Sequence, residues 1–215
     1  MKDIVIFGAG GLGREVACLI KRINTDERQW NLIGFYDDGV PAGSKNEYGI
    51  VIGNAQDLAS SNKEVAVAIA IGNPKTVKKI VEILGINEKL YFPNLISPDF
   101  SISDPDNYEI GYGNIIQRNC TFSCNSKLGN FNILNTGTGF GHDAHAGDFN
   151  SFMPGVKISG EVVIGDCNFF GVGSIVLQQL SIGDGNKLGA GSVLMRKAKN
   201  DNLYMGNPAK KISFD

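Results

Sequence analysis

Residues Leu134–Ile164 read LNTGTG FGHDAH AGDFNS FMPGVK ISGEVV I, and each group of six begins with an apolar residue. The period extends in both directions without a change of register. Its fifteen members are Ile110, Ile116, Phe122, Leu128, Leu134, Phe140, Ala146, Phe152, Ile158, Ile164, Phe170, Val176, Ile182, Leu188 and Leu194. Neither the 3.6-residue period of a helix nor the alternation of a simple strand produces such a repeat. Hexapeptide repeats are typical of a parallel β-helix, in which the first side chain of each unit points toward the axis.

A second period, of eighteen residues, lies within the first. Glycine directly follows the inward residue at Gly111, Gly129, Gly147, Gly165 and Gly183. Three hexapeptides per coil therefore place these glycines above one another at one corner of a triangular prism. We expect glycine at this corner because it adopts positive φ angles without steric cost.

The composition excludes several classes of protein. The 215 residues carry a formal net charge of −2, so no basic excess suggests nucleic-acid binding. No apolar run approaches the roughly 18 residues of a membrane span, and the residues after Met1 do not resemble a signal peptide. The four cysteines have no Cys-x-x-Cys spacing, and they are Cys18, Cys120, Cys124 and Cys167. We expect reduced thiols in a cytoplasmic protein.

The sequence predicts two domains, residues 1–92 and residues 93–215. In the first, strands at Asp3–Phe7, Asn31–Tyr36 and Glu64–Ile71 alternate with helices that begin after residues 8–13 and 72–74. This alternation predicts a Rossmann-like α/β domain with a parallel sheet. Prolines mark the passage into the second domain, an all-β helix whose C-terminal tail leaves the period after Leu194.

The glycine pattern Gly8-x-Gly10-x-x-Gly13 lies between a predicted strand and a predicted helix, as in nucleotide-binding turns. Backbone amides in such a turn can approach a phosphate, and the helix N-terminus favours negative charge. Asp37 and Asp38 end the next strand, where a carboxylate can accept hydrogen bonds from a ribose or uracil. NAD is an alternative ligand, but the domain is only about half of a dinucleotide fold. A nucleotide-linked sugar fits better, and a turn used only for packing is the other alternative.

The two histidines, His142 and His145, are the only ones in the chain. Neither occupies an inward position, and Asp143 directly follows His142. A carboxylate beside an imidazole stabilises the imidazolium that forms on proton uptake, which suits a general base in acyl transfer. For His145 we expect a solvated side chain. A metal site is disfavoured because the stretch offers no clear fourth ligand.

The C-terminal tail is basic. It could hold the phosphates of coenzyme A, or it could be a solvated tail. Its cationic residues are Arg196, Lys197, Lys199, Lys210 and Lys211.

Together these features resemble the hexapeptide-repeat sugar acyltransferases of the sialic acid O-acetyltransferase (NeuD-like) family, which includes N-acetyltransferases of nucleotide-linked 4-amino sugars. The resemblance covers almost the whole chain. It rests on IFGAGGLGREV at Ile6–Val16, FYDD at Phe35–Asp38, AIGNPK at Ala70–Lys75, NTGTGFGHDAHAGDF at Asn135–Phe149, and GAGSVL and GNPAKKI between Gly189 and Ile212.

The resemblance implies a left-handed β-helix, a homotrimer with active sites between neighbouring β-helices, and acetyl-CoA as cosubstrate. It implies His142 as the general base and Asp143 as its acidic partner. The implied contacts to the nucleotide sugar are Gly10, Gly11, Leu12, Asp37, Asp38, Gly72 and Asn73. The implied contacts to coenzyme A are Ser151, Val172, Gly189 and Ala190.

Two residues depart from the family pattern. Leu12 stands in the glycine turn where members that act on amino sugars commonly have histidine. Ser151 stands nine residues after the base, where many members have a second histidine beside the thioester. We therefore expect an acetyltransferase that acts on an amine or hydroxyl of a nucleotide-linked or sialic-acid-like sugar by direct attack on the thioester. The alternatives are a non-catalytic nucleotide-sugar scaffold or sensor and an NAD-linked regulatory module.

Overall fold

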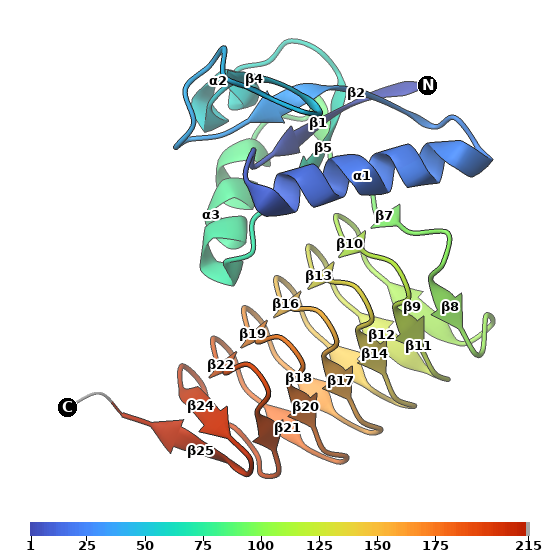
Figure 1. Ribbon diagram of the computed structural model, residues 1–215, viewed down its shortest axis with the longest axis vertical. Coiled ribbons are helices and arrows are strands. Elements are labelled where there is room, and N and C mark those ends of the chain that lie inside the picture. Colours follow the sequence, from blue (N-terminus) through green and yellow to red (C-terminus); the bar gives the residue numbers. More distant parts are fainter. Residues whose placement is uncertain (214–215) are drawn as a thin grey trace. The chain divides into compact units, whose positions relative to one another are not determined.

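The computed structural model describes residues 1–213 and divides into two compact units, Met1–Pro98 and a second unit that begins at Asp99 (Figure 1). Each unit has its own buried apolar core. Among the described residues, no helix combines the length and apolar character needed to cross a membrane.

The first unit is a Rossmann-like α/β fold on a six-stranded sheet with the order β3-β4-β2-β1-β5-β6. Its strands are β1 (Lys2–Phe7), β2 (Trp30–Tyr36), β3 (Lys45–Asn46), β4 (Gly49–Gly53), β5 (Val65–Ile69) and β6 (Leu90–Tyr91). Its helices are α1 (Gly11–Asp26), α2 (Ala55–Ala59) and α3 (Pro74–Leu84), and β7 (Leu95–Ile96) follows. All neighbouring strands of the sheet are parallel except β3 and β4, so the predicted parallel sheet is confirmed.

Apolar periodicity explains how these elements pack. Helix α1 buries Val16, Leu19 and Ile20 on one face, each at most 2% exposed. Strand β5 is buried at all five positions, as expected for a parallel strand covered on both faces. The sheet therefore holds the glycine turn before α1 and the carboxyl end of β2 in fixed positions.

The second unit is a parallel β-helix with three sheets, and Figure 1 shows its coils stacked along one axis. One sheet runs β25-β24-β22-β19-β16-β13-β10, the second β23-β20-β17-β14-β11-β8 and the third β21-β18-β15-β12-β9. In chain order the strands are β8 (Ser101–Ile102), β9 (Tyr108–Ile110), β10 (Ile115–Ile116), β11 (Thr121–Phe122), β12 (Ser126–Leu128), β13 (Ile133–Leu134), β14 (Gly139–Phe140), β15 (His145–Ala146), β16 (Ser151–Phe152), β17 (Lys157–Ile158), β18 (Val163–Ile164), β19 (Phe169–Phe170), β20 (Ile175–Val176), β21 (Ser181–Ile182), β22 (Lys187–Leu188), β23 (Val193–Leu194), β24 (Leu203–Gly206) and β25 (Ala209–Ile212).

The pairing register confirms the coil of eighteen residues, since Ile133 pairs with Ser151 and Ser151 with Phe169. The predicted inward residues are buried from Ile116 to Leu194, and Ile110 at the start of the series is partly exposed. Aromatic rings stack inside the helix, where the centroids of Phe152 and Phe170 lie 4.8 Å apart. The left-handed sense of the coil stays a prediction.

The expected reason for the glycine ladder is wrong. The corner glycines from Gly111 to Gly183 do not have positive φ angles. An acidic or amide side chain of the next coil instead lies where their Cβ would be, so that a Cβ on Gly147 would collide with Oδ1 of Asp166. That Oδ1 accepts a hydrogen bond from the Asp148 amide at 2.8 Å. Glycine is required here by close approach of a side chain and not by backbone conformation.

Candidate active site

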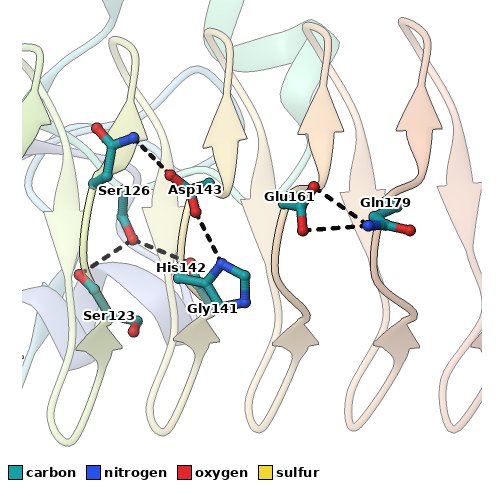
Figure 2. A network of polar contacts seen from close by, with 8 residues as sticks. Ser123, Ser126, Gly141, His142, Asp143, Glu161 and Gln179 are labelled. Atoms are coloured by element: carbon teal, nitrogen blue, oxygen red, sulfur yellow. Dashed lines mark hydrogen bonds and ion pairs between the residues drawn. The ribbon is translucent and has the colours of Figure 1, made fainter.

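His142 lies in the turn between β14 and β15, where its side chain is 54% exposed. Its Nδ1 atom lies 2.9 Å from Oδ2 of Asp143, and Figure 2 shows the imidazole turned toward this carboxylate. The backbone of Asp143 is in the left-handed region, with φ of 57°. The predicted pair is therefore in direct contact, and the contact through Nδ1 leaves Nε2 as the nitrogen that can exchange a proton.

The Asp143 carboxylate has a second partner that the sequence analysis missed. Nδ2 of Asn125 donates a hydrogen bond to Oδ1 of Asp143 at 2.7 Å. The hydrogen bonds from Asn125 and His142 hold the pKa of Asp143 below its ordinary value, and the charges of His142 and His145 act in the same direction. Asn125 stands eighteen residues before Asp143, so the coil period was the signal that could have found it.

Gly160 of the following coil lies against the ring of His142. A Cβ on Gly160 would lie 2.5 Å from Nε2 of His142 and 2.7 Å from Cε1. The carbonyl oxygen of His142 accepts a hydrogen bond from the Glu161 amide at 2.8 Å. The next coil therefore fixes the backbone of His142 and leaves room for its ring only because residue 160 is glycine.

His145 differs from the expected solvated side chain. It lies in β15 and is only partly exposed, and its Nε2 atom is buried without a hydrogen-bond partner among residues 1–213. The prediction for His145 is therefore wrong at this nitrogen. Its charge acts on Asp143, which places it in the electrostatic surroundings of the pair.

The glycine turn of the first unit has the geometry of a close backbone approach. Gly8 has φ of 110°, and a Cβ on Gly13 would collide with the Gly8 carbonyl oxygen. A Cβ on Gly10 or Gly11 would meet nothing within 4 Å. Gly10 caps the N-terminus of α1, and Gly11 and Leu12 are its first two residues. The space beside the two glycines is open, so a ligand can reach the backbone there.

Both carboxylates at the end of β2 are held by backbone amides. Asp37 accepts hydrogen bonds from Ala9 at 2.8 Å and from Gly39 at 2.7 Å, which ties the glycine turn to the end of β2. Asp38 accepts one from Ala55 at 2.9 Å, at the start of α2. Asp37 and Asp38 also line a cavity of about 230 Å³. The structure thus gives both acids a local structural role in addition to the predicted role in binding.

Other predicted contact residues lie in varied environments. The Asn73 side chain caps α3 by accepting from the Thr76 amide at 3.2 Å, and a Cβ on the preceding Gly72 would meet nothing within 4 Å. In the second unit, Ser151 is buried at 1% exposure, Val172 is exposed at 54% and Ala190 is exposed. The remaining residue, Gly189, lies against Met205, whose Cγ would be 2.8 Å from an added Cβ.

The basic tail folds into the antiparallel hairpin of β24 and β25 and encloses a pocket of about 480 Å³. Four of the five predicted cations line it, and Lys199 does not. The lining residues are Leu194, Met195, Arg196, Lys197, Tyr204, Pro208, Ala209, Lys210 and Lys211. A pocket lined by both cationic and apolar residues suits a phosphorylated ligand with an apolar part.

The described part of the chain contains no group of three or more His, Cys, Asp or Glu residues placed to hold a metal ion. Its cysteines form no disulfide. Burial raises the pKa of the Cys120 thiol to about 11, so this thiol is not a nucleophile at neutral pH.

Comparison with known proteins identifies the family. The PglD N-terminal domain family matches residues 3–84. The acetyltransferase domain of PglB from Neisseria gonorrhoeae FA1090, solved in complex with acetyl coenzyme A, is 30% identical in sequence. It aligns over 98% of this chain and 99% of that domain with a TM-score of 0.87. The chain belongs to the hexapeptide-repeat sugar acyltransferases.

Two further solved structures resemble this sugar acyltransferase along its whole length. WeeI from Acinetobacter baumannii AYE is 28% identical, with 99% of this chain and 100% of that chain covered and a TM-score of 0.87. Perosamine N-acetyltransferase from Caulobacter crescentus, in complex with CoA and GDP-perosamine, shares the fold at 23% identity. It covers 100% of this chain and 98% of its own, with a TM-score of 0.86. No protein of curated function matches the sequence.

Proposed function

We propose that the protein transfers the acetyl group of acetyl-CoA to the amine of a nucleotide-linked amino sugar. The observation that carries the proposal is the contact of 2.9 Å between Nδ1 of His142 and Oδ2 of Asp143, which leaves Nε2 on an exposed ring. We choose an amine over a hydroxyl by analogy with perosamine N-acetyltransferase, whose name states transfer to nitrogen.

His142 acts as the general base in this proposal. Nε2 accepts a proton from the acceptor nitrogen as that nitrogen forms its bond to the thioester carbonyl carbon. Asp143 stabilises the imidazolium and keeps the proton of neutral His142 on Nδ1. The imidazolium then returns the proton to the sulfur as the carbon–sulfur bond breaks, and the products are an amide and free coenzyme A. The acetyl group passes directly from coenzyme A to the acceptor, without a covalent acetyl-enzyme intermediate.

Coenzyme A carries phosphate groups, and the basic pocket beside the C-terminal hairpin fits them. Its cations Arg196, Lys197, Lys210 and Lys211 can pair with phosphate, and Tyr204 adds an aromatic surface. We infer that Val172, Gly189 and Ala190 contact the remainder of the molecule. The predicted contact at Ser151 requires the buried hydroxyl to become accessible.

We infer that the nucleotide sugar binds to the first unit. The open backbone at Gly10 and Gly11 and the N-terminus of α1 suit its phosphates. Asp37 and Asp38 suit hydroxyl or base N–H donors beside the cavity that they line. We further infer a homotrimer, as the family resemblance implies, and a cytoplasmic location, as expected for a protein with reduced thiols.

A panel of acceptors tests this function. UDP-, dTDP- and GDP-linked 4-amino sugars are each compared with the matching 4-hydroxy sugar, and release of coenzyme A from acetyl-CoA is followed. The proposal predicts turnover with at least one amino sugar and background release with its hydroxyl counterpart. Turnover with the hydroxyl sugars or free sialic acid alone would reject the amine as acceptor. Tight binding of nucleotide sugar without any transfer would favour a scaffold.

A further inference from the structure

One corner of the β-helix carries four polar residues at intervals of eighteen, all with left-handed φ angles between 53° and 61°. They are Asn125, Asp143, Glu161 and Gln179. Their side chains form two pairs, in each of which an amide donates to a carboxylate. Asn125 bonds to Asp143 at 2.7 Å, and Gln179 bonds to the two oxygens of Glu161 at 3.3 Å. Figure 2 shows the second pair on the two coils that follow His142.

We propose that Asn125 is a positioning residue of the active site, which orients the Asp143 carboxylate so that His142 keeps its proton on Nδ1 and its lone pair on Nε2. The consequence for catalysis rests on the proposed function. The consequence for the imidazole itself concerns the free protein and stands apart from any substrate.

The need for such a residue follows from the exposure of the pair. The Asp143 side chain is 45% exposed, so water competes for its oxygens and the carboxylate would otherwise rotate. The bond from Asn125 occupies Oδ1 and leaves Oδ2 directed at the ring. Because the amide can only donate to this carboxylate, it also favours the ionised form that His142 requires.

The coil that carries Asn125 also anchors the backbone on both sides of His142. The Asp143 amide donates to the carbonyl oxygen of Cys124 at 3.0 Å. The hydroxyl of Ser126 donates to the carbonyl oxygen of Gly141 at 3.2 Å, and Figure 2 shows this contact. Ser126 itself is fully buried. The position of Asn125 relative to Asp143 is therefore set by the stacking of the two coils, and not by the side chains alone.

The ladder supplies a matched pair of substitutions for the test. Asn125→Asp and Gln179→Glu each keep the shape of the side chain and remove the donor to a carboxylate at the same corner. Asp tolerates the left-handed backbone, as Asp143 itself does with φ of 57°. Of these two substitutions, Asn125→Asp acts on the Asp143 carboxylate that contacts His142, and Gln179→Glu acts on Glu161. Asn125→Ala removes the donor without adding a charge.

The first readout is the tautomer of His142, taken from imidazole ¹⁵N NMR shifts at about pH 8, where imidazoles are neutral. The chain has only two histidines, so the spectrum of His145→Gln assigns the signals of His142. In the other variants, the signals of His145 serve as an internal reference. Wild type and Gln179→Glu should show the Nδ1–H form of His142. Both Asn125 variants should show a mixture of tautomers.

The second readout is steady-state kinetics. Both Asn125 variants should lower kcat about tenfold, as for one lost hydrogen bond to a charged group, with each KM within about twofold of wild type. Gln179→Glu should leave kcat unchanged. Wild-type tautomer and kcat in both Asn125 variants would overturn the proposal, as would an equal effect of Gln179→Glu. Absence of turnover in wild type would count against the proposed function, while the NMR result would still decide the role of Asn125.

Discussion

The imidazole of His142 packs against Gly160 so closely that a Cβ on Gly160 would lie 2.5 Å from Nε2. The nitrogen concerned is the one that would exchange the proton. His142 and Gly160 stand eighteen positions apart, and the ring of His142 occupies the space that a side chain at position 160 would need. The glycine fixes where Nε2 can lie.

Substitution of Gly160 should therefore damage catalysis more than stability. Gly160→Ala forces the ring of His142 away, and we expect kcat to fall about 10- to 100-fold, because a displacement near 1 Å can cost this much. The neighbouring Ser159→Ala adds no atom beside the ring and serves as the control. Steady-state assays and thermal unfolding of both variants check this. Near-normal kcat in Gly160→Ala would show that the ring position is not critical.

The acidic limb of the pH profile should include the ionisation of His142 and no contribution from Asp143. Since its hydrogen bonds lower the pKa of Asp143, the carboxylate stays ionised through the range of about pH 5–8, where imidazoles change charge. Wild-type kcat/KM should therefore fall on the acidic side as His142 and the amine of the acceptor are protonated, while Asp143 stays ionised. Asp143→Asn removes the charge that stabilises the imidazolium, so kcat should fall and the acidic limb should move to lower pH. An unchanged acidic limb would contradict the role of Asp143.

The lowered pKa of Asp143 also predicts how the stability of the fold depends on pH. Because the pKa of Asp143 is lower in the folded protein, the pair stabilises the fold above the ordinary pKa of Asp, and this contribution is lost as the pH falls through the lowered value. Thermal unfolding should show a smaller difference between wild type and Asp143→Asn at about pH 3 than at pH 7. A constant difference would contradict the linkage.

The basic pocket should act on the nucleotide end of coenzyme A. Lys210→Ala removes one exposed cation and should raise KM for acetyl-CoA about fivefold, as for roughly 1 kcal/mol. S-acetylpantetheine lacks the nucleotide phosphates, so its kcat/KM should not change. Lys199 does not line the pocket, and Lys199→Ala serves as the matched control. If Lys210→Ala lowered kcat/KM equally for acetyl-CoA and S-acetylpantetheine, the phosphates of coenzyme A would not bind in this pocket.

The glycine corner should be sensitive to a single methyl group. Gly147→Ala brings a Cβ into Oδ1 of Asp166, and we expect a loss of about 1–3 kcal/mol in the free energy of unfolding. Asp166→Ala removes the colliding atom, so the double variant should lose less than the sum of the two single variants. Denaturant unfolding of the three variants checks this. Strict additivity would show that the collision is not the cause.

The fold was accessible from sequence because the period of six is unbroken and its members, such as Phe152 and Phe170, fill one axis. Two features were not accessible. The period located the corner at Gly147 but not the Asp166 side chain that occupies it. Asn150 and Asn168 form part of a buried ladder, in which Oδ1 of Asn150 accepts from the Asn168 amide at 2.9 Å. Such contacts join different coils, and a reading along one coil does not show them.

The site was accessible in part. The pair of His142 and Asp143 is adjacent in sequence, so it could be predicted. The contact with Asn125 and the packing of Gly160 arise only when coils are placed above one another. The buried Nε2 atom of His145 was missed for a related reason, since an outward position in the repeat does not guarantee exposure.

A single comparison tests the central claim most directly. Release of coenzyme A is measured for wild type and His142→Asn with the nucleotide-linked amino sugar that the panel identifies, and thermal unfolding verifies that both proteins are folded. With His142 as the general base, the variant should lose at least about 100-fold in kcat. A variant that turns over within a few-fold of wild type would contradict this account.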